Sequence, residues 1–261
     1  MTRMKNIIDS HVHLDLIAHH HPHRIPWLKE NGCAVISWSY FEGVDSVSQL
    51  EACLKAKAQC IRDLSEGGLG CYYLAGVHPR SMPPDLKPEQ IGSLLKAHLE
   101  DPLCRGIGEI GLETGNEKEQ EVFLAQLEVG TSLLNRGNII GVHTPRSQKM
   151  PVTQTILDIL DRFPGLSSSL VVDHCTLETI TAVLDAGFWA GVTLSPPKTS
   201  LDEMKRIVSL CPDRIDRIMC NTDSDAAFFE DAVQASRADD MPESVREKLF
   251  YRNAAAFFTI T

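Results

Sequence analysis

The sequence lacks the long apolar runs of a membrane protein. A membrane-spanning helix needs about 20 consecutive apolar residues, and no stretch approaches that length. The first residues, Met1–Asn6, lead directly into Ile7–His13 without the apolar segment of a signal peptide. We therefore expect a cytoplasmic protein with no membrane partner.

Cysteine pairs and linkers are also missing. None of the eight cysteines forms a C-x-x-C pair, so we expect most of them to be free, buried thiols in a reducing compartment. No visible neighbour would activate one of them as a nucleophile. No low-complexity tract, charge block or linker marks a boundary, and residues 1–261 are therefore predicted to form one domain.

Positive charge is scarce. The 25 lysines and arginines face 35 aspartates and glutamates, which gives a formal net charge of −10. Binding to a nucleic-acid backbone depends on neutralisation by lysine and arginine, so a broad nucleic-acid surface is not favoured. A local basic pocket, or metal ions that bind phosphate, would be compatible with this charge.

What the sequence does contain is a repeated alternation of short apolar runs and longer amphipathic stretches. The short runs are mostly continuous, as in parallel strands buried on both faces: Asn6–Asp9, Cys33–Trp38, Cys71–Val77, Arg105–Gly111, Ile139–His143, Leu170–His174, Phe188–Leu194 and Arg217–Thr222. Helical spacing predicts helices over Val47–Leu64, Glu119–Asn135, Thr153–Phe163, Glu178–Ala186 and Glu243–Phe258. Eight alternations in 261 residues predict a (β/α)₈ TIM barrel. An open sheet with fewer strands is the alternative.

The first strand ends in a pair of histidines, His11-Val12-His13. Alternate residues on a strand point to one face, which inside a barrel is the lumen. The pair could therefore bind a metal, and Asp9, which shares this parity, could orient one of the rings. The pair alone leaves open a second interpretation, two chance histidines in a histidine-rich segment.

Further candidate ligands stand at the ends of other strands: Glu109, His143, His174 and Asp223. Barrel enzymes place their active sites at the carboxyl ends of the strands, and a shared cation removes the cost of desolvating a carboxylate there. Four histidines and two carboxylates are too many for one zinc with an open position, which usually takes three protein ligands. They suffice for two divalent ions. The alternative for each residue is a satisfied polar group of the core.

The ordered motifs resemble those of the TatD family of metal-dependent hydrolases, a branch of the amidohydrolase-type barrels. They are I-D-S-H-V-H-L-D (8–15), A-G-V-H-P (75–79), G-E-I-G-L-E (108–113), V-H-T (142–144), D-H-C (173–175) and T-D-S (222–224). The resemblance runs from residue 6 to about residue 258, where Arg252-Asn253 and Phe257-Phe258 match the family's closing motif.

The resemblance implies a role for each matching residue. His11, His13 and Asp223 would bind one metal, His143 and His174 the other, and Glu109 would bridge the two. His78 would lie near the substrate, although a loop histidine packed beside its neighbouring proline is an equal alternative.

Three segments depart from the wording typical of the family's nucleases. H-T-P-R (143–146) replaces H-S-R-D, N-T-D-S-D (221–225) replaces E-T-D-S-P, and V-D-H-C (172–175) replaces F-H-C-F. These changes affect the substrate pocket more than the metal ligands. The H-T-P-R and G-L-E-T segments are closer to a divergent subgroup that includes bacterial proteins labelled EboC.

Together these features predict metal-assisted hydrolysis. Two divalent ions, zinc first with manganese, iron or magnesium as alternatives, would activate water, and Asp223 could act as general base beside the bridging Glu109. Arg146 and Lys149 could bind an anionic group of a small-molecule substrate, as could Lys198 in the Pro196-Pro197-Lys198 segment. We expect cleavage of a phosphoester or a related bond. The alternatives are an exonuclease-like deoxyribonuclease, an amidohydrolase cleaving a C–N or C–O bond, and a barrel that binds metal or metabolite without turnover.

One histidine-rich segment, His19–His23, follows the first strand. The barrel topology places it in a loop above the metals, where it could shape the pocket or bind adventitious metal. A solvated loop is the favoured interpretation.

Overall fold

Eight parallel strands form the centre of the molecule. The computed structural model describes residues 7–132, 137–195, 198–225, 229–238 and 240–260. Each strand pairs in parallel with the next along the chain, from β1 to β8. The strands are β1 Ile7–Val12, β2 Cys33–Ser37, β3 Cys71–Ala75, β4 Cys104–Gly111, β5 Ile139–His143, β6 Leu170–Val172, β7 Trp189–Thr193 and β8 Ile218–Asn221.

The first and last strands meet, so the sheet closes on itself. The amide of Asp223 donates to the carbonyl of His11 at 2.9 Å, and the amide of His13 donates to the carbonyl of Ser224 at 2.8 Å. Val12 and Ser224 form a parallel bridge at the same place. The predicted TIM barrel is thus confirmed, and the open sheet is wrong.

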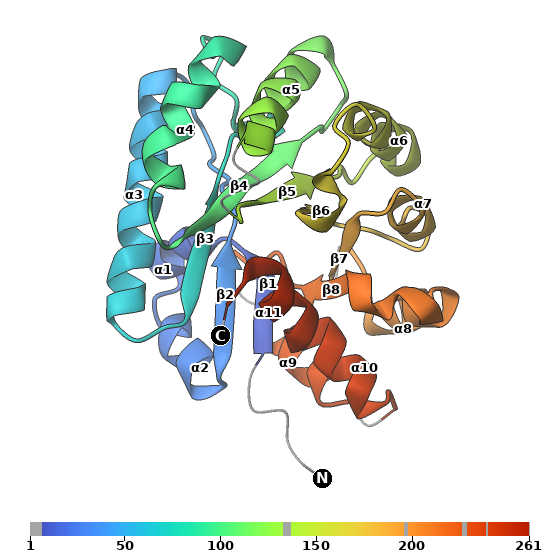
Figure 1. The fold of residues 1–261 in the computed structure, drawn as a ribbon. Helices are drawn as coiled ribbons and strands as arrows, with labels where there is room; N and C mark the ends of the chain where they lie inside the picture. The colour runs from blue at the N-terminus through green and yellow to red at the C-terminus, as the bar shows by residue number, and fades with distance from the viewer. Residues whose placement is uncertain (1–6, 133–136, 196–197, 226–228, 239, 261) are drawn as a thin grey trace.

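Helices surround the strands (Figure 1). Those of the described residues are α1 Leu14–His20, α2 Arg24–Glu30, α3 Val47–Glu66, α4 Ile91–Leu99, α5 Glu117–Ser132, α6 Lys149–Leu160, α7 Ile180–Asp185, α8 Leu201–Leu210, α9 Phe229–Ser236, α10 Glu243–Glu247 and α11 Asn253–Phe258. The five predicted helices are confirmed, with ends displaced by a few residues. The predicted closing helix is α10 and α11 joined by a π-helical turn over Lys248–Arg252. Asn6 and residues 133–136, at the ends of two predicted elements, lie outside the described residues.

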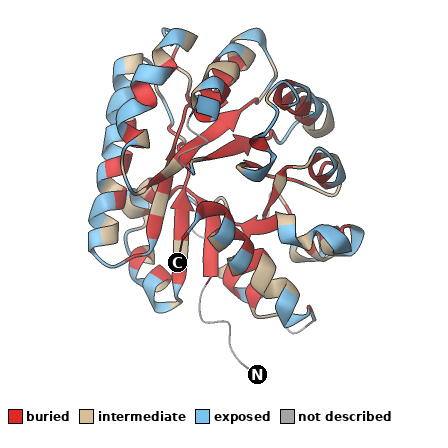
Figure 2. Cartoon of the chain, in the orientation of Figure 1, coloured by how far each residue is buried: buried red, intermediate tan, exposed pale blue. Residues whose placement is uncertain are grey.

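Burial explains why the strands are continuous apolar runs. Figure 2 shows the strands buried and the outer faces of the helices exposed. Every residue of β1, β5 and β8 is buried, because the helices cover one face and the lumen the other. A polar side chain at the end of such a strand therefore enters an enclosed space, where it needs a partner.

A buried ion pair supports the start of α1, directly after His13. The Nζ of Lys57, on α3, donates to Asp15 Oδ1 at 2.5 Å and to Ser37 Oγ at 2.7 Å. Ser37 Oγ also accepts the amide of Leu14 at 2.9 Å. The Lys57 side chain has 0% exposure, so the pair links α1, β2 and α3 in the interior.

Lys57→Ala is expected to destabilise the protein by about 3–5 kcal/mol, because it leaves the Asp15 carboxylate, which is only 15% exposed, without its partner. Urea unfolding measures the change. The matched control is Lys55→Ala on the same helix, where an exposed pair with Glu51 has 68% and 49% side-chain exposure. That substitution should change stability by less than about 1 kcal/mol. Equal losses in the two variants would contradict the assignment.

The cysteines are free thiols, as predicted from the sequence. All eight cysteines are free, and six of them are buried. Burial raises the pKa of Cys175, next to His174, to about 12, so this thiol does not ionise at neutral pH.

Within the described residues, no helix combines the length and apolarity needed to cross a membrane.

Candidate metal centre

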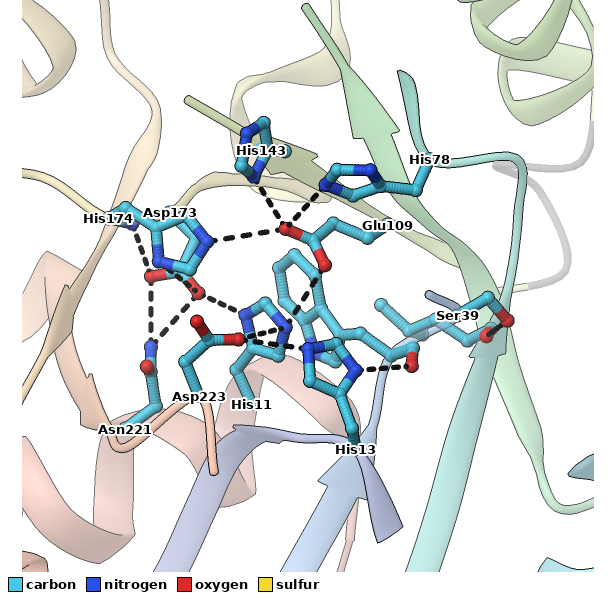
Figure 3. Close-up of polar contacts among 12 residues, drawn as sticks. His11, His13, Ser39, His78, Glu109, His143, Asp173, His174, Asn221 and Asp223 are labelled. Atoms are coloured by element: carbon cyan, nitrogen blue, oxygen red, sulfur yellow. Dashed lines mark hydrogen bonds and ion pairs between the residues drawn. The ribbon is translucent and has the colours of Figure 1, made fainter. Parts of the chain in front are cut away.

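The six predicted metal ligands come together at the carboxyl end of the barrel: His11, His13, Glu109, His143, His174 and Asp223. The first four lie in β1, directly after it, in β4 and at the end of β5. His174 and Asp223 lie just beyond β6 and β8 in the left-handed region, at φ 58° and φ 50°. That conformation is uncommon outside glycine and clusters at functional sites. Here it accompanies two side chains that face the centre of the barrel (Figure 3).

Glu109 lies at the middle of the cluster, and its two oxygens face different histidines. Oε2 is 3.3 Å from His11 Nε2. Oε1 is 2.7 Å from His143 Nδ1 and 3.2 Å from His174 Nε2. Figure 3 shows the carboxylate between the two groups of rings. This is the arrangement expected of a bridging ligand.

Asp223 completes the first group. Its Oδ1 is 3.0 Å from His13 Nε2 and 3.3 Å from His11 Nε2. One ligand atom from each of His11, His13, Glu109 and Asp223 lies within 4.8 Å of the others, which is close enough for a shared metal ion. The grouping coincides with the first metal site that the family resemblance implies.

His78 belongs to the second group. Its Nε2 lies 3.6 Å from Glu109 Oε1, and His78, Glu109 and His143 form another set with ligand atoms within 4.8 Å. The sequence predicted His78 near the substrate and assigned His143 and His174 to the second metal. The structure brings all three rings to the same carboxylate oxygen.

The two histidines of the first strand are held from behind. His11 Nδ1 contacts Asp173 Oδ2 at 2.5 Å, and its ring stacks on Trp38 with centroids 4.1 Å apart. His13 Nδ1 donates to the carbonyl of Trp38 at 3.2 Å. In each ring this leaves Nε2 facing the carboxylates, and such fixation by outer partners is typical of metal-ligating histidines.

The other two histidines are held in the same way. His143 Nε2 contacts Glu113 Oε2 at 2.9 Å, so that Nδ1 faces Glu109. His174 Nδ1 contacts Thr193 Oγ1 at 2.8 Å, so that Nε2 faces Glu109. All four histidines therefore present one nitrogen to the centre and bind an acceptor with the other.

The residues fit a bound divalent cation. Within the described part of the chain, the buried atom His11 Nε2 makes no hydrogen bond, although carboxylate oxygens of Glu109 and Asp223 lie 3.3 Å from it. A buried polar atom without a partner costs about 1–3 kcal/mol, and a metal ion at this point would supply the missing contact. His78 differs, because its Nδ1 accepts the amide of Arg80 at 2.9 Å and its proton therefore lies on Nε2. Imidazole nitrogens mixed with carboxylate oxygens suit zinc, manganese or iron.

The protonation states also fit. Burial opposes the charge of Glu109, but His11 and His78 hold its pKa well below the usual range. Asp223 is likewise held low against its burial, by His11 and Lys198. Burial lowers the pKa of His174 to about 3. Two anionic carboxylates beside a neutral imidazole are the ligand states that metal binding requires.

The pKa of His11 shows that the carboxylates favour a positive charge at this point. Burial opposes its charge, yet Glu109 and Asp223 raise its pKa to about 10. The two carboxylates thus draw a positive charge to the point between them. A divalent cation satisfies the same demand, and its binding would release the proton.

The predicted role of Asp9 is wrong. Asp9 accepts hydrogen bonds from the amide of Thr222 at 3.0 Å and from its hydroxyl at 2.6 Å, and it contacts no histidine ring. The closure of β1 against β8 brings Thr222 to this carboxylate. Asp173, next to His174, orients His11 instead.

The histidine-rich segment comprises the end of α1 and the turn that leads to α2. His19 and His20 are the last residues of α1 and are exposed. Because α1 begins at Leu14, directly after His13, its seven residues carry them about 10 Å along the helix axis. The favoured interpretation, a solvated segment, is consistent with this exposure.

A pocket of about 350 Å³ opens beside His174. Arg146, Lys149 and Lys198 all line it. Lys149 donates to Thr144 Oγ1 at 2.6 Å, and burial lowers its pKa to about 8, so it still carries a charge at pH 7. Arg146, Lys198 and His174 also line the smaller opening over Glu109 and Asp223, so the pocket adjoins the metal centre.

Lys198 reaches further into the centre than the sequence indicated. Its Nζ contacts Asp223 Oδ2. The neighbouring Pro196 and Pro197 lie outside the described residues. The contact of Glu113 with His143 was also missed, although Glu113 belongs to the G-E-I-G-L-E motif and could have been found there. For Lys198 the sequence offered only its position after the seventh strand.

A closed parallel barrel with histidines and carboxylates converging at the carboxyl ends of its strands defines a class, the metal-dependent hydrolase barrels. The model of one family, described as TatD related DNase, matches residues 8–249. The chain belongs to this family. The resemblance to the EboC subgroup stays a prediction.

Three individual proteins are similar to this chain in sequence or fold. An uncharacterized metal-dependent hydrolase of Methanocaldococcus jannaschii is 29% identical over 134 residues, which is 51% of each chain; the match spans about half of that relative. A TatD-like protein of Archaeoglobus fulgidus is 27% identical, with a TM-score of 0.72 over 97% of this chain and all of its own. A putative amidohydrolase of Staphylococcus aureus shares the fold at 15% identity, with a TM-score of 0.66 over 98% of this chain and 99% of its own.

Proposed function

We propose that the protein hydrolyses a phosphoester or related bond in a small anionic substrate, using two divalent ions. The observation that carries the proposal is Glu109, whose two oxygens face separate groups of histidines. His11, His13 and Asp223 would hold one ion, and His143 and His174 the other. Zinc is our first expectation, given the nitrogen-rich ligand set.

The reaction needs an activated water and a base. Divalent ions supply Lewis acidity and allow water to act as a nucleophile at neutral pH. Asp223 contacts His11, His13 and Lys198 at the opening of the centre. Its Oδ1 faces the histidines and its Oδ2 contacts Lys198, and we propose that this carboxylate accepts the proton of the attacking water.

The charge of the centre favours an anionic substrate. Four carboxylates contact the histidines, namely Asp173, Glu109, Glu113 and Asp223, and two divalent ions would balance their four charges. Four cations, Arg80, Arg146, Lys149 and Lys198, then outnumber the two glutamates that also line the outer pocket, Glu178 and Glu203. A positive mouth on a chain of net charge −10 attracts a compact anion and gives no extended track for a duplex.

A deoxyribonuclease is the second candidate, since the family description names a DNase. A single strand end would be enough to place a phosphodiester at the metals. The amidohydrolase alternative draws on fold similarity alone. The full ligand set argues against a barrel without turnover.

Metal analysis followed by parallel assays tests the proposal. The purified protein should hold close to two divalent ions per chain, and the loaded protein should cleave a small phosphomonoester faster than DNA or an amide. Protein that accepts no zinc or manganese at neutral pH would rule out the metal centre. Efficient degradation of DNA would instead establish the nuclease.

Arg146→Ala is expected to raise KM for a small anionic substrate about tenfold with little change in kcat. Loss of a charged hydrogen bond costs about 1.5–3 kcal/mol, and the lower end of this range applies because Arg146 is exposed. Steady-state kinetics on the metal-loaded protein measures this. The control is Arg162→Ala, an exposed arginine just past the other end of α6, which should leave KM unchanged. An unchanged KM in Arg146→Ala, with DNA cleavage at the wild-type rate, would favour the nuclease.

A further inference from the structure

A buried chain of hydrogen bonds joins two candidate ligands behind the metal centre. It runs from His174 Nδ1 to Thr193 Oγ1 at 2.8 Å and on to Asn221 Oδ1 at 2.9 Å. Asn221 Nδ2 reaches the Asp173 oxygens at 2.9 and 3.1 Å, and Asp173 Oδ2 meets His11 Nδ1 at 2.5 Å (Figure 3). All five residues are buried. We propose that Thr193 is a positioning residue that fixes which nitrogen of His174 faces the metal, an inference that rests on the metal-dependent function proposed above.

The direction of each bond follows from Asp173. A carboxylate accepts hydrogen bonds, so Asn221 turns its Nδ2 toward Asp173 and its Oδ1 toward Thr193. Oδ1 then accepts the single hydroxyl proton of Thr193. The Thr193 oxygen has only lone pairs left for His174. His174 must therefore carry its proton on Nδ1 and present the lone pair of Nε2 to Glu109 and the metal.

Lys198 does not compete for this nitrogen. Its Nζ lies 3.2 Å from His174 Nδ1 and 3.4 Å from Nε2. The lone pairs of the two ring nitrogens point in divergent directions, so a donor nearly equidistant from both lies along neither. Thr193, at 2.8 Å from Nδ1 alone, is the partner that decides the tautomer.

The backbone of β7 leaves room for the Asp173 carboxylate, which fixes the direction of these hydrogen bonds. A Cβ added at Gly191 would lie 2.1 Å from Asp173 Oδ1, so the carboxylate packs against a residue without a side chain. Gly191 and Thr193 both belong to β7. One strand therefore admits the carboxylate at one position and supplies the hydroxyl two residues later.

Thr193→Val tests the assignment, since valine keeps the shape and removes the hydroxyl. Competition between the zinc-loaded full chain and a chromophoric chelator measures the affinity of each bound ion. Loss of an outer partner of a ligand usually costs about 10–100-fold in metal affinity, and we expect a loss of that size at one of the two positions. Thr193→Ser, which restores the hydroxyl, should recover the wild-type affinity.

A second buried threonine controls for the loss of a hydroxyl. Thr153, on α6, is fully buried, and its Oγ1 has no partner among the described residues, so Thr153→Val should bind zinc as the wild type does. Unchanged binding in Thr193→Val, or an equal loss in Thr193→Ser, would overturn the inference. Should valine not fold at position 193, Thr193→Ala removes the same hydroxyl. Wild-type protein that binds no zinc would contradict the proposed function itself.

Discussion

Glu109→Gln is expected to lower activity about a thousandfold or more, because it would remove the carboxylate that we propose bridges two ions, and with them several kcal/mol of transition-state stabilisation. Glutamine keeps the size of the side chain but loses the charge. It also places an amide NH₂ where an oxygen now faces a histidine nitrogen, His11 at 3.3 Å or His143 at 2.7 Å. The zinc content should fall from about two ions per chain to one or fewer.

Zinc content and kcat, measured on the same preparations, check this prediction. Glu128→Gln is the matched control, an exposed glutamate on α5, and should retain both quantities. Glu113→Gln is expected to be intermediate, since an amide oxygen can still accept from His143 Nε2, with a loss of about 10–100-fold in metal affinity. Wild-type zinc content in Glu109→Gln would show that the ions, if bound, do not share this carboxylate.

The convergence of the candidate ligands could be predicted from the sequence because each stands at or near the end of an apolar strand. His143 and Glu109 are examples: the runs Ile139–His143 and Arg105–Gly111 are recognisable without any tertiary information, and a barrel sends all such ends to one face. The number and order of the strands were accessible for the same reason. The strand ends themselves shift by a few residues, as at β1, which extends to Val12.

The partners behind the ligands could not be predicted. Asp173 contacts His11 across 162 residues of sequence, and only the relative register of β1, β6 and β8 decides that Asp173, and not Asp9, meets the ring. Lys198 reaches Asp223 through the conformation of a segment with no periodic pattern. Contacts of this kind depend on side-chain rotamers and loop paths, which apolar periodicity does not encode.

The departures from the family's nuclease wording acquire a physical meaning in this chain. These positions were expected to line the substrate pocket, yet Asp173 and Asn221 lie behind the ligands, where Asn221 Nδ2 donates to Asp173 at 2.9 Å. Asp173 stands where the family wording has phenylalanine, and Asn221 where it has glutamate. Asp173 contacts His11, and Asn221 is connected to His174 through Thr193. Because the two residues also hydrogen bond to each other, the two differences are best understood as a pair.

Removal of the metal should lower the melting temperature by about 5–10 °C for each ion, since a ligand present at 100 times its Kd stabilises the folded state by about 2.7 kcal/mol and each kcal/mol shifts Tm by about 2–4 °C at this chain length. Without cations, the buried carboxylate of Glu109 and the half-buried carboxylate of Asp223 face His11 and His13 at 3.0–3.3 Å, and His11 must take up a proton. Calorimetry before and after chelation, with metal content verified, measures the shift, and added zinc should reverse it. Glu109→Gln, expected to hold fewer ions, should respond less to the chelator than the wild type. An unchanged melting curve after verified removal would mean that hydrogen bonds alone satisfy these side chains, and that the cluster does not depend on a cation for its stability.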